Sequence, residues 1–193
     1  MRKQQSRDGS ASDDEPASIN ELESDLFNGA AGADDAIDPA TDARKARKKA
    51  MDLLARREYG FAELVGRLGG AGFARDTAED VVAVLADEGL QDDSRFAASF
   101  LTAKSGRGTG PLRIRQALKE KGLSARTVDL AFDGDDTDWH QRAREVRVKK
   151  FGAEVPADFA GKAKQMRFLN YRGFDRDHID AAFDAAADDV GEF

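Results

Sequence analysis

The sequence contains no cysteine among its 193 residues. Its absence excludes a disulfide framework, a thiolate nucleophile and any zinc or iron–sulfur site with cysteine ligands. No apolar run approaches the roughly 18 residues that a transmembrane helix needs. Polar and acidic residues follow the first five, so we expect no signal peptide. These absences together predict a cytoplasmic protein without a membrane segment.

Charge is unevenly distributed along the chain. The 30 Lys and Arg against 37 Asp and Glu give a net charge of −7, which argues against a nucleic-acid partner. Residues 1–42, however, hold three basic and 11 acidic residues, whereas residues 43–193 carry a net charge of +1. The first segment has few large apolar residues, so we predict a disordered acidic tail. Ile19, Leu22 and Leu26 lie at helical spacing and leave a short binding helix as the alternative.

From about Ala43 onward, apolar residues recur at the spacing of an amphipathic helix. No segment alternates as a strand would, so the sequence predicts an all-α fold. Pro111 suits a first helical position, and side chains suited to helix N-caps precede several apolar runs. The predicted caps are Asp76, Ser124 and Asp175.

A repeat of about 50 residues organises these helices. Gly72, Gly122 and Gly173 are 50 and 51 residues apart, and a leucine stands four residues before each. Such a glycine suits the left-handed residue that ends many helices. The spacing predicts three tandem three-helix repeats in an elongated array. We place the repeats at residues 43–91, 92–136 and 137–193, the last with a short acidic C-terminal end.

The residues suggest no enzyme, cofactor or metal site. His140 and His178 have no recognisable ligand or nucleophile partner and are interpreted as surface or capping residues. Asp92-Asp93 and Asp135-Asp136 suit caps and turns better than acid–base chemistry. The glycine-rich segment 106–110 lacks the P-loop pattern and follows no strand. We therefore interpret it as a flexible basic link between two helices.

Basic residues form three clusters. Residues 44–57 carry a net charge of +6, residues 104–121 carry +5 and residues 142–150 carry +4. Each cluster alone could be a solvated helix face with i, i+4 pairs. Three clusters in a nearly neutral region favour a polyanionic or acidic partner surface. The aromatic residues lie at core spacing, which favours contact with phosphates or acidic protein patches over base stacking: Phe96, Phe100, Phe132 and Trp139.

The repeats also carry a family resemblance. In the first repeat it rests on Leu53 to Tyr59, Glu63-Leu64 and Arg67-Leu68, and in the third on Arg167-Phe168-Leu169, Arg172-Gly173-Phe174 and Ile179. The middle repeat matches most specifically, through Asp92 to Ala97, Gly108, Gly110-Pro111, Arg113-Ile114, Leu118 and Lys121-Gly122. Over residues 43–185 the sequence resembles the RecX family, regulators of the RecA recombinase. Gly60 departs from the serine that is common there, which affects only a helix cap.

The resemblance implies an elongated, curved array of three-helix repeats without enzymatic activity. It further implies a regulator, which we expect to be monomeric, that binds RecA and lies in the groove of the RecA–DNA filament. Such binding inhibits filament growth, recombinase and co-protease activities, and so modulates DNA repair, recombination and the SOS response. A direct DNA-binding protein of helix-turn-helix type is the alternative, and weak binding to single-stranded or duplex DNA fits both. We expect the contact residues to be Arg95, Arg107, Arg113, Arg115, Lys119, Lys121, Arg126, Arg147, Lys149 and Lys150.

Overall fold

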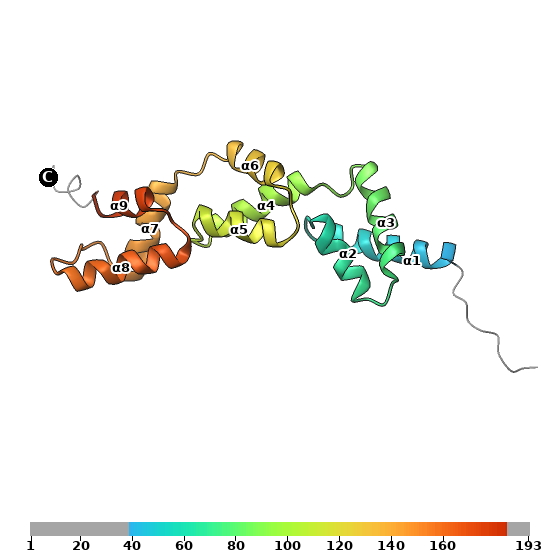
Figure 1. The fold of residues 1–193 in the computed structure, drawn as a ribbon, viewed down its shortest axis with the longest axis horizontal. Helices are drawn as coiled ribbons and strands as arrows, with labels where there is room; N and C mark the ends of the chain where they lie inside the picture. Colours follow the sequence, from blue (N-terminus) through green and yellow to red (C-terminus); the bar gives the residue numbers. More distant parts are fainter. Residues whose placement is uncertain (1–38, 185–193) are drawn as a thin grey trace, which may run out of the picture. The chain divides into compact units, whose positions relative to one another are not determined.

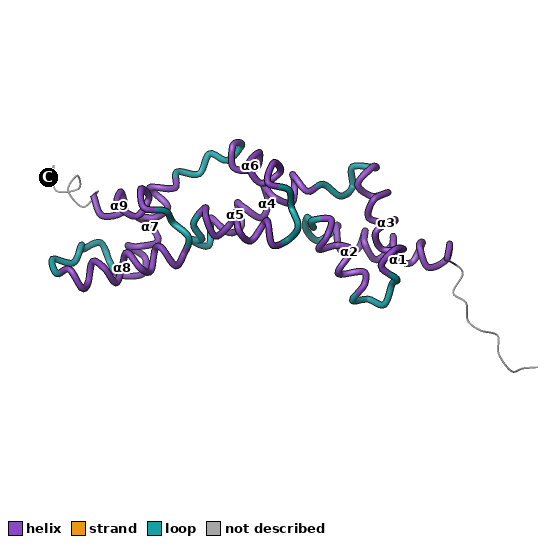
Figure 2. The backbone as a smooth tube through the Cα atoms, viewed as in Figure 1, coloured by secondary structure: helices purple, strands orange, loops and turns teal. Residues whose placement is uncertain are grey.

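The structure, a computed structural model, describes residues 39–184, and the predicted tail before Pro39 and the acidic C-terminal end lie outside this range. Within it the chain forms nine helices and no strand (Figures 1 and 2), which confirms the all-α prediction. The helices are α1 (Pro39–Leu54), α2 (Phe61–Gly69), α3 (Arg75–Asp87), α4 (Asp93–Ser105), α5 (Pro111–Glu120), α6 (Ala125–Asp133), α7 (Trp139–Phe151), α8 (Phe159–Arg172) and α9 (Arg176–Asp184).

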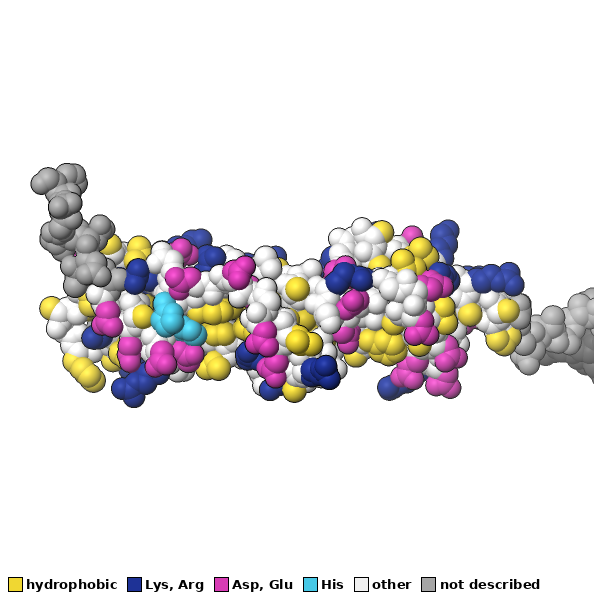
Figure 3. Space-filling view, turned by 90° about the horizontal axis from the view of Figure 1, so that it is seen from above, with side chains coloured by type: hydrophobic (Ala, Val, Ile, Leu, Met, Phe, Trp, Pro, Cys, Tyr) yellow, Lys and Arg dark blue, Asp and Glu magenta, His cyan; other side chains and the backbone are white. Residues whose placement is uncertain are grey.

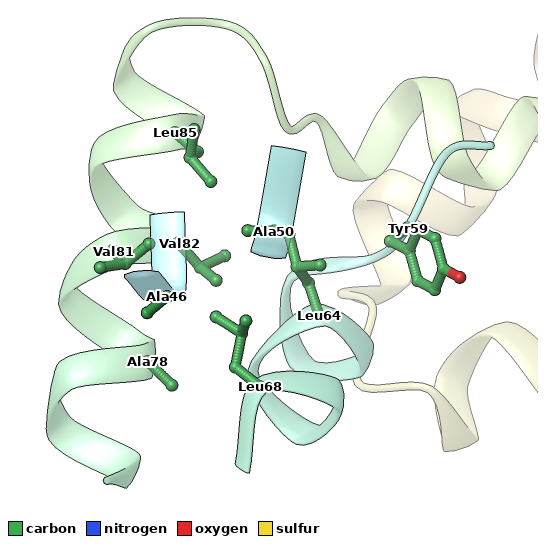
Figure 4. Close-up of a cluster of buried hydrophobic side chains, with 9 residues drawn as sticks. All are labelled: Ala46, Ala50, Tyr59, Leu64, Leu68, Ala78, Val81, Val82 and Leu85. Atoms are coloured by element: carbon green, nitrogen blue, oxygen red, sulfur yellow. The ribbon is translucent and has the colours of Figure 1, made fainter. Parts of the chain in front are cut away.

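The helices pack in consecutive groups of three, which we call bundle 1 (α1–α3), bundle 2 (α4–α6) and bundle 3 (α7–α9). In each bundle the first helix packs against the third and the second completes the core. Figure 4 shows how side chains from all three helices of bundle 1 meet. The three cores are built from Ala46, Ala50, Leu64, Leu68 and Val82; from Phe96, Leu101, Ile114 and Leu118; and from Ala143, Leu169, Phe174 and Ile179.

A left-handed glycine ends the second helical segment of every bundle. Gly72, Gly122 and Gly173 have φ of 97°, 88° and 91°, which confirms the turns predicted from their spacing. In each case the next residue donates its backbone N–H to the carbonyl of the leucine four residues before the glycine, as a Schellman motif requires. These bonds are Phe73 to Leu68, Leu123 to Leu118 and Phe174 to Leu169, each 3.2 Å long.

Helix starts follow the predicted chemistry in most places. Pro111 is the first residue of α5, and the side chains of Ser124 and Asp175 accept backbone N–H groups at the starts of α6 and α9. Asp76 is not the cap of α3, however, because the N-cap is Ala74. The Asp76 carboxylate lies in the first turn instead, where negative charge favours the positive end of the helix dipole.

Helix α1 begins four residues earlier than the predicted boundary of the tail. Residues 39–42 belong to this helix, because Pro39 suits its first position and Asp42 supplies negative charge to its first turn. Among the described helices, none combines the length and the apolar composition that crossing a bilayer requires.

Candidate anion-binding groove

Bundles 2 and 3 meet through the ends of two helices. The backbone N–H of Gly110, at the start of α5, donates to the carbonyl of Arg172 at 2.8 Å. The N–H of Leu112 donates to the carbonyl of Gly173 at 3.0 Å. The first N–H groups and the last carbonyls of a helix have no partner inside that helix. Here, at what we call the second junction (between bundles 2 and 3), they satisfy one another across 61 and 62 residues of sequence, which fixes α5 against α8.

Glycine is required on both sides of the second junction. A Cβ atom at Gly110 would overlap the backbone of Gly173, and one at Gly173 would overlap Arg113. A Cβ at Gly108 would lie 2.7 Å from Cγ2 of Val146. The interpretation of residues 106–110 as a flexible link is therefore wrong, since this segment connects α4 to α5 with its backbone held against bundle 3.

Two neighbouring cavities open at this junction, and we call them together the junction groove. One has a volume of about 450 Å³ and is lined by the basic residues Arg107, Arg142, Lys149, Lys150 and Arg172. The other, about 640 Å³, shares Lys150 and Arg172 and adds Lys104 and Arg113. The acidic residue in the lining, Glu145, is already paired with Arg142 at 2.8 Å. The groove therefore has a large excess of positive charge.

Aromatic rings border the same groove. Phe100 and Phe168 are half-buried, and Lys104 and Arg172 lie 5.1 Å and 5.2 Å from the centres of their rings. Tyr171 is 73% exposed, with the Arg113 guanidinium 4.9 Å from its ring centre. Phe100 packs against the core of bundle 2, as its spacing predicted, and also forms part of the groove wall.

The structure brings four of the predicted contact residues together in the junction groove: Arg107, Arg113, Lys149 and Lys150. Sequence reasoning missed Arg172 as a member, although its position directly before Gly173 matches that of Lys121 before Gly122. Lys119 and Arg126 are exposed but lie outside the lining of both cavities.

Arg147 is wrong as a contact residue, because only 2% of its surface is exposed. Its guanidinium donates to the carbonyls of Ala182 at 2.9 Å, Ala153 at 3.1 Å and Glu154 at 3.3 Å. Burial lowers the pKa of Arg147, but a guanidinium in a protein stays charged. Its side chain therefore holds the end of α9 and the α7–α8 loop together inside bundle 3.

Three further predicted contact residues have acidic partners in this chain. Arg95 pairs with Glu58 at 3.1 Å, and Arg115 pairs with Asp129 while its guanidinium lies 4.0 Å from the ring centre of Phe132. Lys121 pairs with Glu63 at 2.9 Å. Their charges are already compensated, which weakens the case for each of them as an anion contact.

Glu63 lies at the first junction, between bundles 1 and 2. It accepts hydrogen bonds from Arg57 at 2.6 Å and from Lys121 at 2.9 Å. Burial by itself raises the pKa of Glu63, but these two cations outweigh burial and hold the pKa below its ordinary value. The carboxylate is therefore ionised at neutral pH and neutralises positive charge at this junction.

The two histidines lie together, away from the groove lining. Their rings are 4.9 Å apart in an edge contact, and the backbone of His178 is capped by Asp175. Figure 3 shows the histidines on a face where acidic and basic side chains are interspersed. In the described part of the chain, no three acidic or histidine side chains are placed to hold a metal ion.

Comparison with known proteins gives consistent matches. A family model described as the second three-helix domain of RecX matches residues 92–131, and one described as the third three-helix domain matches residues 136–183. Regulatory protein RecX of Pseudomonas fluorescens is 42% identical over 133 residues, which are 69% of this chain and 86% of the relative. That of Halorhodospira halophila is 41% identical over 143 residues, covering 74% of this chain and 89% of the relative.

Solved structures show the same fold. A crystal structure of regulatory protein RecX matches with a TM-score of 0.63 at 21% identity, over 74% of this chain and 71% of that chain. The crystal structure of RecX from Lactobacillus salivarius matches with a TM-score of 0.64 at 19% identity, over 77% and 98% of the two chains. Both likenesses support the tandem three-helix architecture.

Proposed function

This chain belongs to the RecX family of regulatory proteins, and from that membership we propose that it binds the RecA recombinase and its nucleoprotein filament. Binding would inhibit filament growth and, with it, the recombinase and co-protease activities that depend on the filament. The observation that carries the proposal is the 42% identity to a regulatory protein RecX across 86% of that relative.

The proposed mechanism is stoichiometric binding without chemistry. A protein that binds one filament state more tightly than another shifts the assembly balance by the difference in binding free energy. The tandem bundles and the excess positive charge of the junction groove support such a role, because both RecA-bound DNA and acidic protein surfaces attract cations.

Cosedimentation with RecA filaments tests this proposal. The full chain is mixed with RecA filaments preformed on single-stranded DNA, with the same DNA alone, and with duplex DNA. We expect retention by the filament to exceed retention by either DNA, and RecA-dependent ATP hydrolysis to fall as the chain approaches stoichiometric amounts. Undiminished hydrolysis would contradict the proposal, and preferential retention by bare duplex would favour the helix-turn-helix alternative.

A further inference from the structure

The two junctions between bundles bring matching helix ends together, although among the described residues only the second has backbone hydrogen bonds between those ends. At the first, the start of α2 approaches Gly122, and at the second the start of α5 approaches Gly173. The N-caps Gly60 and Gly110 have nearly the same extended backbone, with φ of −70° and −78° and ψ of 153° and 164°. Matching positions of the two junctions can therefore be compared residue by residue.

The comparison shows opposite charge at one matching position. The third residue after the N-cap glycine is Glu63 at the first junction and Arg113 at the second. The residue before the left-handed glycine is Lys121 at the first and Arg172 at the second. Where the first junction has an ion pair between Glu63 and Lys121, the second junction therefore has two arginines.

Among the described residues, neither arginine is paired with a carboxylate. Arg113 donates from Nη1 to the carbonyl of Tyr171 at 2.8 Å, and Arg172 donates from Nη1 to the carbonyl of Arg107 at 3.4 Å. A carbonyl orients a guanidinium but carries no net charge. The lysines that share the cavity, Lys104 and Lys150, add two further cations. Like charges held close together repel, and an anion placed among them removes that cost.

We propose that the second junction is a phosphate-binding site that takes the backbone of a single-stranded nucleic acid, with Arg113, Arg172, Lys104 and Lys150 as its phosphate contacts. Fixed guanidinium groups suit phosphate oxygens, and nearby lysines add point charges. The inference identifies what one surface of the proposed RecA regulator contacts, so its biological role rests on the proposed function. The site itself is argued from contacts within this chain.

The shape of the groove favours a single strand over a duplex. Its walls are α7, the ends of α4 and α8, the α4–α5 link and the first half of α5, and the lining is recessed. Reading duplex DNA requires an element that protrudes into the major groove. A single strand instead follows a basic groove and stacks bases on exposed rings, and Tyr171 presents such a ring beside Arg113.

A pair of charge reversals on one helix tests the site. Arg113→Glu and Lys119→Glu change the net charge by the same amount, but Lys119 lies outside the groove lining. Affinity of the full chain for a labelled oligothymidine is measured by fluorescence anisotropy without RecA at low salt. We expect Arg113→Glu to weaken binding at least tenfold and Lys119→Glu by less than threefold. Equal weakening by both would overturn the assignment to the second junction.

Stability and salt dependence give independent readouts. In Arg113→Glu the new carboxylate would face Arg172 as Glu63 faces Lys121, so we expect a thermal unfolding midpoint within a few degrees of the unaltered chain. If this variant fails to fold, Lys150→Gln on the exposed end of α7 takes its place. We expect the same loss of affinity from Lys150→Gln, and Lys164→Gln is its control. The negative slope of log affinity against log salt concentration should become smaller in magnitude by about 0.7 for each lost phosphate contact.

Competition distinguishes phosphate from carboxylate as the ligand. Unlabelled oligothymidine and poly-glutamate of equal charge are each titrated against the labelled complex. We expect the oligonucleotide to compete at a concentration at least tenfold lower. Equal competition by poly-glutamate would overturn the nucleic-acid assignment in favour of an acidic protein segment. Because RecA is absent, failure here leaves the cosedimentation test of the proposed function unaffected.

Discussion

At the residue scale, Glu63 determines the charge of the first junction. Its carboxylate is hydrogen-bonded to Arg57 and Lys121, and its side chain is only 14% exposed. Hydrogen bonds to charged groups stabilise a fold more than neutral ones do, and a partly buried pair is screened less by salt than a fully exposed one. Loss of the carboxylate leaves two cations facing each other without a counter-charge.

We therefore predict that Glu63→Gln lowers the free energy of unfolding by about 1 to 2 kcal/mol at pH 7. A carboxyl whose pKa is lowered in the folded state stabilises the fold at pH values above its unfolded-state pKa, ordinarily 4.5. That stabilisation is lost as the pH falls through the folded-state pKa. The difference between Glu63→Gln and the unaltered chain should thus shrink below pH 4.5. Urea denaturation at pH 7 and pH 3 measures it, and an undiminished difference at pH 3 would contradict the prediction.

Arg147 shows that the sequence does not predict which basic side chains are buried. The basic cluster groups it with Lys149 and Lys150, but its side chain is buried on the α7 face that also carries Ala143. Three of its four acceptors are backbone carbonyls, which no residue type signals, and the fourth is Oε1 of Gln165. A sequence therefore shows how many cations a segment carries, but only the packing shows which of them reach solvent.

At the element scale, the helix-end contacts between α5 and α8 depend on missing side chains. Gly110 has an ordinary extended backbone, so alanine there is strained only by overlap with Gly173. Gly66, inside α2, offers a control, since a Cβ there would meet nothing within 4 Å. The same Gly→Ala change thus probes packing at one site and helix propensity at the other.

We predict that Gly110→Ala lowers the free energy of unfolding by about 1 to 3 kcal/mol, as overpacking typically does. Gly66→Ala should raise it by up to about 1 kcal/mol, because alanine is the better helix former. Urea denaturation measures both, and hydrogen exchange at the Leu112 amide reports whether its bond to Gly173 opens. A neutral Gly110→Ala with unchanged exchange would contradict the role assigned to this junction.

The elements differ in how far the sequence predicts them. Helix periodicity, the first position of Pro111 and the left-handed glycines are local features, so spacing alone predicted them. The junctions join residues far apart in the chain, such as Glu63 and Lys121 or Gly110 and Arg172. Compensated and uncompensated cations look the same in a sequence, so the three clusters could not reveal that positive charge concentrates at the second junction.

At the scale of the whole molecule, charge divides between the helical region and the segment before it. Residues 1–38 hold three basic and ten acidic residues, and residues 39–193 have a net charge of zero. The negative charge of the whole chain therefore comes from the first 38 residues. We expect that charge to repel polyanions and to compete with them for the groove cations. Salt at 0.1 M screens such an effect beyond about 10 Å.

We predict that removing residues 1–38 strengthens binding of single-stranded DNA at low salt, by about tenfold for a coupling of 1.4 kcal/mol. The first described helix begins at Pro39, so the shortened chain contains all nine described helices. Because the effect is electrostatic, the gain should shrink as salt rises from 50 mM towards 500 mM. Anisotropy titrations of both chains across that range measure it. Equal affinities at low salt would contradict the prediction, since a net charge of −7 would then have been removed without consequence for an anionic ligand.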